Sequence, residues 1–342
     1  MVGFCIYYNN RDDGCQVIFY KSKRKKQVQN MNSYHYEPIE ERERLILVDT
    51  DIGGDCDDAG AMAVLFRLAQ EKHFSFAVAC CTPEPTGAEA VGAIAGSRGV
   101  TLPSVGLAER TPLLADDIYH VYDRPVAAEF RGRYPAVPTE EALVFYLRVL
   151  RAAPDGGVVW VPIGPLHQLA EVWRVDPELV ARKVSAVVCM GGVYGDFAVN
   201  GHREYNLRVA ADATRTVFGE FPCPIICVGL ELGRRIPSGF AEKNAADPVN
   251  RCYEIHTKGK MLRPSWDPLT VLFAVEGEGA NFRISEPGIN RIEPDGSNFF
   301  TPDPAGHHYY LTERRAPAEI AAYLEQLYRI PADLREERKK HQ

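Results

Sequence analysis

A run of apolar residues leads directly into an acidic loop in the stretch LILVDTDIGGDCDD, which covers residues 45–58. The apolar half predicts a buried β-strand, and the five aspartates among residues 49–58 predict a loop that opens a helix. Carboxylates at this density repel one another unless protons or a cation neutralise them. Oxygen ligands of this kind suit calcium or magnesium better than zinc or copper. The stretch therefore predicts a metal-centred site at the end of a strand.

Three other interpretations explain less of this loop. Asp57 or Asp58 could cap the helix that follows, but capping accounts for only one or two of the acids. An EF-hand counted from Asp49 would need a glutamate where Gly60 stands. A phosphotransfer loop built on an aspartyl nucleophile would usually have a hydroxyl residue where Gly53 stands.

Composition excludes several classes of protein. The 342 residues include 39 Lys and Arg against 46 Asp and Glu, and this mild acidity without a basic stripe argues against nucleic acid as a partner. No apolar run approaches the roughly 20 residues of a membrane span, and no apolar signal-peptide core is visible. The nine cysteines show no zinc-site spacing, and several lie in apolar strands. We therefore expect reduced thiols in a cytoplasmic protein.

The chain divides into three parts by composition. Residues 1–43 carry a basic run at 21–26 and little periodicity, which predicts a poorly structured arm, or an extension of the gene model if translation starts at Met31. Residues 44–330 show no repeat and no clear linker, and are predicted to form a single domain. Residues 331–342 are predicted to be a charged tail.

Apolar strands alternate with helices from residue 45 onward. This order predicts an α/β fold with a mostly parallel, Rossmann-like central sheet and helices on both faces. An extra hairpin and helix segment is expected at the C-terminal end. The predicted strands are 45–48, 74–81, 104–107, 158–161, 185–190 and 224–229, the helices are 58–70, 86–96, 139–151, 210–218, 247–262, 267–275 and 317–328, and hairpins are expected within 286–308.

Polar and glycine-rich segments follow several of these predicted strands. In parallel sheets, ligands bind beyond the carboxyl ends of the strands. The acidic loop, Gly164-Pro165, Gly191-Gly192 and Leu230 all fall at that edge. We therefore expect them to share one rim.

Four segments, taken together and in order, resemble the inosine-uridine-preferring nucleoside hydrolase family. They are the acidic loop, residues 159–169, the pair Met190-Gly191-Gly192 and Glu204-Tyr205-Asn206, and Ser265-Trp266-Asp267-Pro268. The match runs from about residue 44 to about residue 275, and the longer C-terminal part resembles a divergent branch of the family. The resemblance implies a nucleoside-hydrolase-like fold, bound Ca²⁺, a small nucleoside-like substrate and a homodimer or homotetramer.

The resemblance also implies a set of metal ligands. Asp51, Asp58, the backbone carbonyl of Ile163 and Asp267 would bind calcium. Asp55 belongs to a loop that is two residues longer than the family's, and it could take over one of these roles. Asp51 would in addition accept a proton from the attacking water, and Asp267 could instead merely cap a helix.

A second implied set binds the sugar. Asp57 would face the ribose hydroxyls or the metal, Glu204 and Asn206 would hold ribose hydroxyls, and Met190 would line the sugar pocket. Glu204 could instead be a surface charge, Asn206 a turn residue and Met190 plain core.

The chemistry implied by the resemblance suits these residue types. Cleavage of an N-glycosidic bond passes through a cationic sugar, which nearby carboxylates stabilise. Calcium would orient a water and the ribose diol and lower the pKa of that water. A carboxylate beside the metal would serve as general base.

The sequence departs from the family at Trp266, which stands where a histidine usually protonates the departing base. An indole N–H only donates hydrogen bonds, although the ring can stack on a base. Another acid could replace the histidine, the leaving group could need none, or hydrolysis could be lost. The candidate replacement acids are Tyr119, His120, Tyr122, His202, Tyr253 and His256.

Two other functions remain open. One is a non-catalytic or altered-chemistry homologue that binds calcium and a ribosyl ligand. The other is a magnesium-dependent phosphohydrolase, for which Arg203, Arg208, Arg234 and Arg235 would have to hold phosphate.

Overall fold

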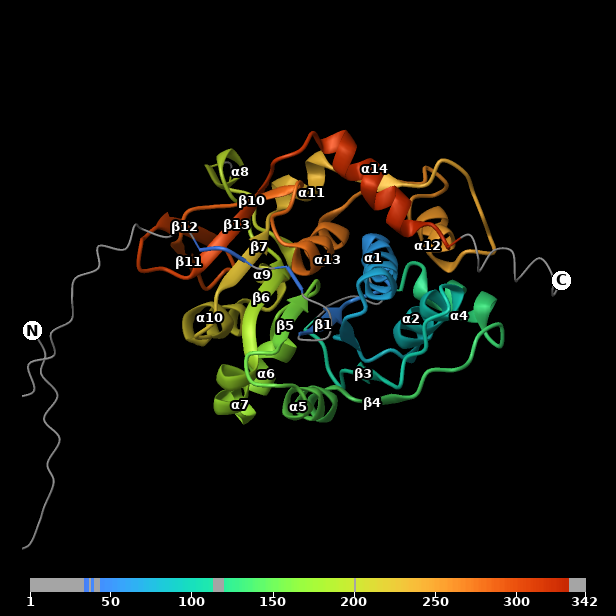
Figure 1. Ribbon diagram of the computed structural model, residues 1–342, viewed down its shortest axis with the longest axis horizontal. Coiled ribbons are helices and arrows are strands. Elements are labelled where there is room, and N and C mark those ends of the chain that lie inside the picture. Colours follow the sequence, from blue (N-terminus) through green and yellow to red (C-terminus); the bar gives the residue numbers. More distant parts are fainter. Residues whose placement is uncertain (1–33, 37, 40–43, 113–119, 200, 332–342) are drawn as a thin grey trace, which may run out of the picture. The chain divides into compact units, whose positions relative to one another are not determined.

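Strand β1 (Leu45–Thr50) lies at the centre of the sheet, between the parallel strands β2 (Ser75–Cys80) and β5 (Val158–Pro162). The computed structural model describes residues 34–36, 38, 39, 44–112, 120–199 and 201–331 (Figure 1). Successive side chains of a strand point to opposite faces. Ile46 and Val48 therefore enter the core on one face of the sheet, and Leu47 enters the core on the other.

The strands follow the spatial order β12-β11-β13-β7-β6-β5-β1-β2-β3-β4, with β10 paired to β13. From β13 to β4 in that order all pairs are parallel, whereas β10, β11 and β12 pair antiparallel. The predicted mostly parallel sheet is therefore confirmed. The remaining bounds are β3 (Val105–Leu107), β4 (Thr139–Glu141), β6 (Val184–Met190), β7 (Ile225–Val228), β10 (Phe282–Ile284), β11 (Gly288–Ile292), β12 (Asn298–Pro302) and β13 (His308–Glu313).

Helices cover both faces of the sheet, and each layer has its own hydrophobic core (Figure 1). The first layer holds α1 (Asp57–Lys72), α2 (Pro85–Ser97), α4 (Asp123–Phe130), α11 (Leu230–Arg235), α12 (Pro248–His256), α13 (Trp266–Glu276) and α14 (Pro317–Tyr328). The second holds α5 (Ala142–Ala152), α6 (His167–Val175), α7 (Pro177–Lys183), α9 (Tyr205–Val209) and α10 (Ala211–Glu220). The short α8 (Asp196–Val199) precedes α9.

The order of the strands reverses at β1. From β1 the chain moves outward through β2, β3 and β4, and then returns to β5 on the other side of β1 and continues through β6 and β7. The connections after β1 and β5 therefore diverge, and a crevice forms beyond their carboxyl ends. This topology places the acidic loop and the Gly164-Pro165 turn at the usual ligand position of such sheets.

The predicted helix over 139–151 is wrong at its first turn. Thr139–Glu141 forms β4, which pairs with β3, and α5 begins only at Ala142. The Glu141 carboxylate caps α5 by accepting hydrogen bonds from the backbone N–H groups of Leu143 and Val144, at 2.7 and 2.9 Å. Glu140 and Glu141 therefore lie just before the helix and not in its first turn. The free edge of β3 favours an extended backbone there, and Glu141 still caps the helix.

The predicted helix over 247–262 is also too long. Helix α12 ends at His256, and the chain turns through left-handed backbone at Lys258, Gly259 and Met261. It then forms β9 (Leu262–Pro264), which pairs antiparallel with β8 (Pro237–Gly239) in a separate two-stranded sheet. Glycine favours this turn, because it reaches positive φ without steric cost.

Both ends of the folded region add to the structure. The predicted C-terminal hairpin is present as β11 and β12, followed by β13 and α14. Within the stretch assigned to the N-terminal arm, Tyr36 is buried and donates a hydrogen bond to the carbonyl of Ala274 at 2.7 Å. The residues described from Tyr34 onward belong to one compact unit, which is the unit discussed below.

None of the described helices has both the length and the apolar composition needed to cross a membrane.

Candidate active site

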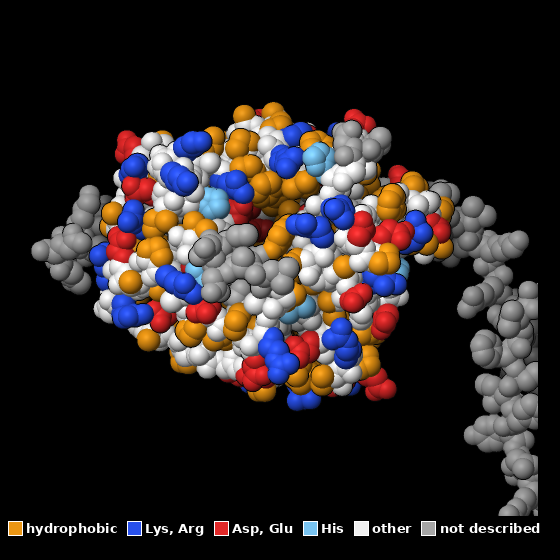
Figure 2. All heavy atoms as spheres, turned by 180° about the vertical axis from the view of Figure 1, so that it is seen from behind, with side chains coloured by type: hydrophobic (Ala, Val, Ile, Leu, Met, Phe, Trp, Pro, Cys, Tyr) orange, Lys and Arg blue, Asp and Glu red, His pale blue; other side chains and the backbone are white. Residues whose placement is uncertain are grey.

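The ten residues predicted to bind the metal, the sugar or the base all line one cavity of about 660 Å³ beyond the carboxyl ends of the strands. A hollow with acidic side chains at its base is visible near the middle of the face shown in Figure 2. The ten residues come from positions spread over more than half of the chain, and the fold brings them together. They are Asp51, Asp55, Asp57, Asp58, Ile163, Met190, Glu204, Asn206, Trp266 and Asp267.

Three buried carboxylates form the floor of the cavity. Oxygen atoms of Asp57, Asp58 and Asp267 all lie within 4.8 Å of one another, and each side chain is almost fully buried. Burial raises the pKa of each carboxyl well above its usual range, and the neighbouring carboxylates raise it further. Such a group of hard oxygen donors fits a divalent cation, which would relieve both effects.

The floor joins the N-termini of two helices from opposite ends of the chain. Asp57 opens α1, yet its carboxylate accepts hydrogen bonds from the backbone N–H groups of Trp266 and Asp267 in the first turn of α13, at 3.0 and 3.1 Å. Asp58 accepts a hydrogen bond from the Thr50 hydroxyl. Helix N-termini favour negative charge, so they help to hold carboxylates that are otherwise costly to bury.

Asp51 stands at the end of β1, facing the turn after β5. A Cβ atom at position 164 would lie 2.9 Å from Oδ1 of Asp51 and 2.8 Å from the sulfur of Cys81, so Gly164 is required for this close approach. Burial raises the pKa of Asp51 to about 7, and the Asp55 and Glu204 carboxylates contribute. A bound cation would lower this pKa again.

The carbonyl of Ile163 points to the same region and accepts a hydrogen bond from Asn206. The side-chain amide of Asn206 donates to the carbonyl oxygens of Ile163 and Met190, at 3.0 and 3.3 Å. A carbonyl oxygen has two lone pairs, so the Ile163 oxygen retains one for another partner. Asn206 and Met190 are both nearly buried, and Asn206 thus ties the ends of β5 and β6 together.

Glu204 is buried and acts as the N-cap of α9. Its carboxylate accepts hydrogen bonds from the backbone N–H groups of Asn206 and Leu207, at 2.7 and 2.9 Å. Burial raises its pKa to about 7 in spite of these bonds. The surface-charge alternative for Glu204 is therefore wrong, and its carboxylate faces the cavity from a fixed position.

Asp55 differs from the floor carboxylates because it has a cationic partner. Arg263 of β9 donates to both of its oxygens, with Nε at 2.9 Å from Oδ1. Nε2 of His256 lies 3.5 Å from the same oxygen. Asp55, Cys56 and His256 form a second group with metal-ligand spacing, but the Arg263 guanidinium already balances the charge of the carboxylate.

Trp266 begins α13, and its indole is held by the protein. The ring N–H donates to the carbonyl of Leu230 at 2.8 Å, and the guanidinium carbon of Arg263 lies 5.2 Å from the ring centre. A Cβ atom at Gly233 would come within 2.1 Å of the ring, so only glycine permits this packing. The N–H of Trp266 is therefore committed to Leu230.

Of the candidate replacement acids, His202 and His256 line the cavity. Tyr122 instead holds the acidic loop, because its buried hydroxyl accepts from the N–H of Gly53 and donates to the carbonyl of Asp55. His120 and Tyr253 do not line it. His120 pairs with Asp123, Tyr253 is buried beside Tyr328, and Tyr119 lies outside the described residues.

The four arginines proposed for phosphate divide into two pairs. Arg203 and Arg234 line the cavity. Arg208 instead lies over the ring of Tyr205, and Arg235 pairs with Glu313 at 2.7 Å.

Sequence reasoning missed Arg263. Its side chain closes one wall of the cavity between Asp55 and Trp266. An isolated arginine in a short strand carries no motif, so its role follows only from the fold.

Comparison with known proteins gives one family. The family model described as inosine-uridine preferring nucleoside hydrolase matches residues 46–321. Pyrimidine-specific ribonucleoside hydrolases of Shigella boydii (putative) and Escherichia coli are 30% identical over 125 residues. This stretch is 36% of the chain, and it covers 49% and 38% of the lengths of those relatives, so the chain matches less than half of either.

Solved structures show the same fold at lower identity. An inosine-uridine preferring nucleoside hydrolase from Bacillus anthracis superposes with a TM-score of 0.63 at 15% identity, covering 83% of this chain and 99% of that one. A purine-preferring ribonucleoside hydrolase from Gardnerella vaginalis gives 0.62 at 16% identity, covering 83% and 98%.

Proposed function

The chain belongs to the inosine-uridine preferring nucleoside hydrolase family, and we propose that it hydrolyses the N-glycosidic bond of a ribonucleoside or related ribosyl compound with the help of calcium. One observation carries the proposal. A floor of three buried carboxylates, the Asp51 carboxylate and the fixed Glu204 and Asn206 side chains line the same cavity at the switch point of the sheet. Buried acids without cationic partners destabilise the fold, so their presence here is explained if they bind a cation and stabilise the positive charge that develops on the sugar.

In the proposed reaction the oxygen of a water bonds to C1′ of the ribose. The C1′–N bond breaks with its electron pair going to the base, one water proton goes to Asp51, and the base takes up a proton. Asp51 suits the role of general base, because its carboxylate lies at the cavity edge of β1 and has a pKa that its burial and the neighbouring Asp55 and Glu204 carboxylates raise. The anionic floor stabilises the positive charge that develops on the sugar.

We assign the metal to the floor carboxylates and the turn after β5. Asp51, Asp58, Asp267 and the carbonyl of Ile163 would hold calcium, which when bound supplies a site for a water and the ribose diol. Asp55 is the weaker candidate ligand, because Arg263 already occupies both of its oxygens.

The sugar side of the cavity is assigned to four residues. Asp57 would face the ribose hydroxyls from the floor. Glu204 and Asn206 would also form hydrogen bonds with ribose hydroxyls. Met190 would pack against the sugar ring, since its side chain lines the cavity beside Asn206.

We propose no particular base for the substrate, because the relatives differ in the bases that they prefer. They include enzymes described as pyrimidine-specific, inosine-uridine preferring and purine-preferring, and the ribose is what these substrates share. We propose that Trp266 contacts the base through its ring, since its N–H is bound to Leu230. If inosine is hydrolysed rapidly and Trp266→Ala leaves the rate unchanged, this role is wrong.

Trp266 also favours a second candidate function, a calcium-dependent ribosyl-binding protein without hydrolysis. The decisive experiment measures release of free ribose from a panel of purine and pyrimidine nucleosides, with calcium and with a chelator. Calcium-dependent release supports hydrolysis. Binding of calcium and nucleoside without release of ribose from any member would establish the second function instead.

His202 and His256 are the candidates for protonating the base, since both line the cavity. A His256→Asn variant that loses hydrolysis of nucleosides, but retains it for a ribosyl compound with an already acidic leaving group, would identify His256 as the acid. The same comparison with His202→Asn tests the other candidate.

We further propose a cytoplasmic location and a homodimer or homotetramer. The seven cysteines among the described residues are free and buried, and even Cys189 and Cys227 leave their sulfurs unbonded at 3.6 Å. Persistent free thiols of this kind suit a reducing compartment. Light scattering of the purified protein tests the oligomeric state.

A further inference from the structure

The mouth of the cavity is basic, in contrast to its acidic floor. His202, Arg203 and Arg234, which we call the basic rim, line the same cavity as the floor carboxylates. We propose that the basic rim binds a phosphate group on the 5′ carbon of the ribosyl substrate, so that nucleoside 5′-monophosphates are preferred over nucleosides. This inference rests on the proposed N-glycosidic hydrolysis and specifies its substrate class.

Arg234 is the central residue of the rim because no carboxylate among the described residues balances its charge. Its side chain is exposed, and it forms no ion pair with an acidic side chain anywhere in the described part of the chain. Arg263, on the same cavity, is bound to Asp55, and the adjacent Arg235 is bound to Glu313. A guanidinium at the mouth of an acidic cavity, with no carboxylate of its own, is suited to an anionic ligand.

Phe197 holds the basic rim together. The guanidinium carbon of Arg234 lies 5.9 Å from the centre of the Phe197 ring, and the rings of Phe197 and His202 are 5.7 Å apart. The aromatic ring between them brings α11 and the segment after α8 to one place. Arg234 and His202, which could both donate hydrogen bonds to a phosphate, therefore meet there from different parts of the chain.

Arg203 extends the rim toward the sugar side. Among the described residues its only ion pair is with Asp295 at 3.2 Å, and both side chains are about half exposed, at 47% and 54%. An exposed pair of this kind is worth little and exchanges readily for a phosphate. Arg203 directly precedes Glu204, which we assigned to the ribose hydroxyls, so the rim continues from the ribose site.

The geometry of the ribose selects the 5′ position. In the proposed reaction C1′ carries the base and receives the water, and the hydroxyls on C2′ and C3′ face the floor. The 5′ carbon is the remaining position for a charged substituent that points to the mouth. Basic and histidine side chains border the hollow in Figure 2, in agreement with a cationic entrance.

Charge balance points the same way. A phosphate dianion would be repelled by the floor carboxylates of this acidic protein unless cations lie between them. The rim supplies those cations, while a nucleoside has no charge that would need them. The bond that breaks is unchanged: water adds to C1′, the base leaves, and the phosphate ester stays intact in the product, ribose 5-phosphate.

The kinetic test compares kcat/KM for AMP, IMP, UMP and CMP with kcat/KM for the four corresponding nucleosides, in calcium-containing buffer. We expect the wild type to prefer the monophosphates by about tenfold at low salt, and the preference to shrink at high salt because the rim is exposed. Arg234→Ala should reduce the preference by about tenfold, and Arg234→Glu should reverse it.

Arg235→Ala is the matched control, since Arg235 is adjacent and exposed but points to Glu313. It should leave the ratio of monophosphate to nucleoside unchanged. Circular dichroism and thermal unfolding verify that each variant is folded. A wild type that cleaves nucleosides but shows no preference for monophosphates would overturn the phosphate site and leave the proposed hydrolysis intact.

A binding measurement separates the two proposals further. Calorimetry with ribose 5-phosphate, ribose and inorganic phosphate tests the rim without any reaction. Tighter binding of ribose 5-phosphate than of ribose, lost in Arg234→Ala, supports the rim even if no substrate is hydrolysed. Equal binding of both sugars, or binding of inorganic phosphate that Arg234→Ala does not weaken, rejects it.

Discussion

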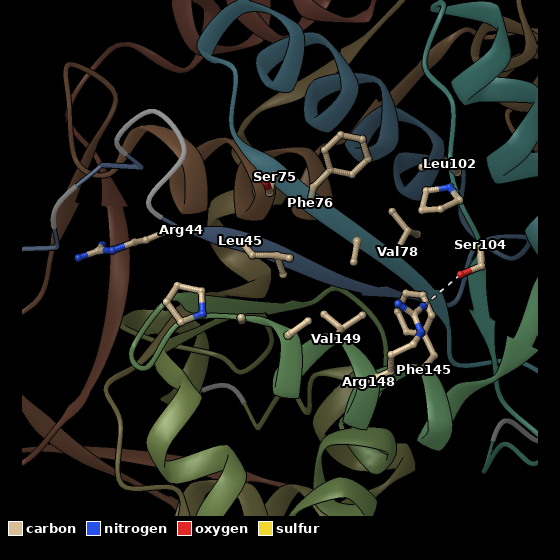
Figure 3. A pocket seen from close by; sticks show the side chains of 15 residues that line it. Arg44, Leu45, Ser75, Phe76, Val78, Leu102, Ser104, Phe145, Arg148 and Val149 are labelled. Atoms are coloured by element: carbon tan, nitrogen blue, oxygen red, sulfur yellow. Dashed lines mark hydrogen bonds between the residues drawn. The ribbon is translucent and has the colours of Figure 1, made fainter.

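The two ends of the parallel strands carry cavities with opposite chemistry. Beyond the carboxyl ends lies the acidic cavity with its buried floor. At the amino ends, a cavity of about 290 Å³ is lined by apolar side chains such as Leu45, Phe76, Val78 and Phe145 (Figure 3). Its polar contacts are paired at the surface, where Arg148 donates to the hydroxyl of Ser104 at 3.2 Å.

Carboxylates at the two ends have pKa values shifted in opposite directions. At the amino ends, the Arg148 guanidinium lowers the pKa of the partly exposed Glu140. At the carboxyl ends, burial raises the pKa of Asp58 and Asp267 well above their usual range. One end of the sheet is therefore arranged for stability, whereas the other holds charges that weaken the fold until a ligand neutralises them. Each prediction below tests this contrast.

The largest effect is expected for Asp267→Asn, which keeps the shape of the side chain and removes its charge. We expect hydrolysis to fall by about a thousandfold or more, because a metal supplies several kcal/mol of transition-state stabilisation. In chelator the same variant should unfold at a higher temperature than the wild type. The carboxyl has a raised folded-state pKa, so its burial costs stability at every pH above its ordinary pKa.

The control for this variant is Asp212→Asn, an exposed position on α10. It should change neither activity nor stability. Retention of hydrolysis by Asp267→Asn, or a lower unfolding temperature in chelator, would contradict the account of the floor.

Phe145→Ala tests the amino end. Phe145 is buried, and Gly106 allows its ring a close approach, since a Cβ atom there would lie 2.9 Å from the ring. We expect the free energy of unfolding to fall by about 3–5 kcal/mol, measured by urea titration. Below the transition the variant should bind calcium as the wild type does. A change in calcium affinity of the folded variant would show that the two ends are coupled.

Glu231→Gln tests a second buried carboxylate beside the acidic cavity. Burial raises the pKa of Glu231 to about 7, and its side chain accepts a hydrogen bond from the N–H of Tyr194 that glutamine can also accept. The unfolded chain releases the proton near pH 4.5, so wild-type stability declines as the pH rises from there to about 7. The variant should be more stable by about 2 kcal/mol at pH 8 and equal at pH 4. Parallel unfolding curves at both pH values check this, and equal stability at pH 8 contradicts it.

Arg148→Ala should have the smallest effect. Its ion pair with Glu140 is exposed, so we expect a loss below about 1 kcal/mol that shrinks further in high salt. Ribose release should be unaffected. A loss of several kcal/mol would mean that the amino-end contacts carry more of the stability than their exposure indicates.

The sequence predicted the strands that are apolar on both faces, because such strands can only lie inside a covered parallel sheet. The strand order predicted one shared rim for the acidic loop and the Gly164-Pro165 turn, and the family resemblance added Glu204 and Asp267, which line the same cavity. Assignment of Thr139–Glu141 failed because three residues with weak preferences adopt the conformation that the free edge of β3 offers.

The contacts of Asp55 and Tyr122 were beyond prediction for a different reason. Asp55 meets Arg263, and Tyr122 supports the loop through its hydroxyl, across large separations in sequence. No local pattern marks such partners, and only the fold brings the start of α4, with Tyr122, and β9, with Arg263, to the acidic loop. The same applies to Gly233, whose missing side chain makes room for Trp266.

The hydrogen bonds from the first turn of α13 to Asp57 have a consequence for synthesis of the protein. They join residues that are about 210 positions apart, so a nascent chain that has emerged only through β7 carries Asp51, Asp57 and Asp58 but lacks both the N–H groups of α13 and the Asp267 carboxylate. Contacts of such long range form late, because loop closure must precede them. In the proposed metal site, tight cation binding would therefore begin only after the ribosome has delivered α13, and binding of the ion would mark the end of folding rather than its start.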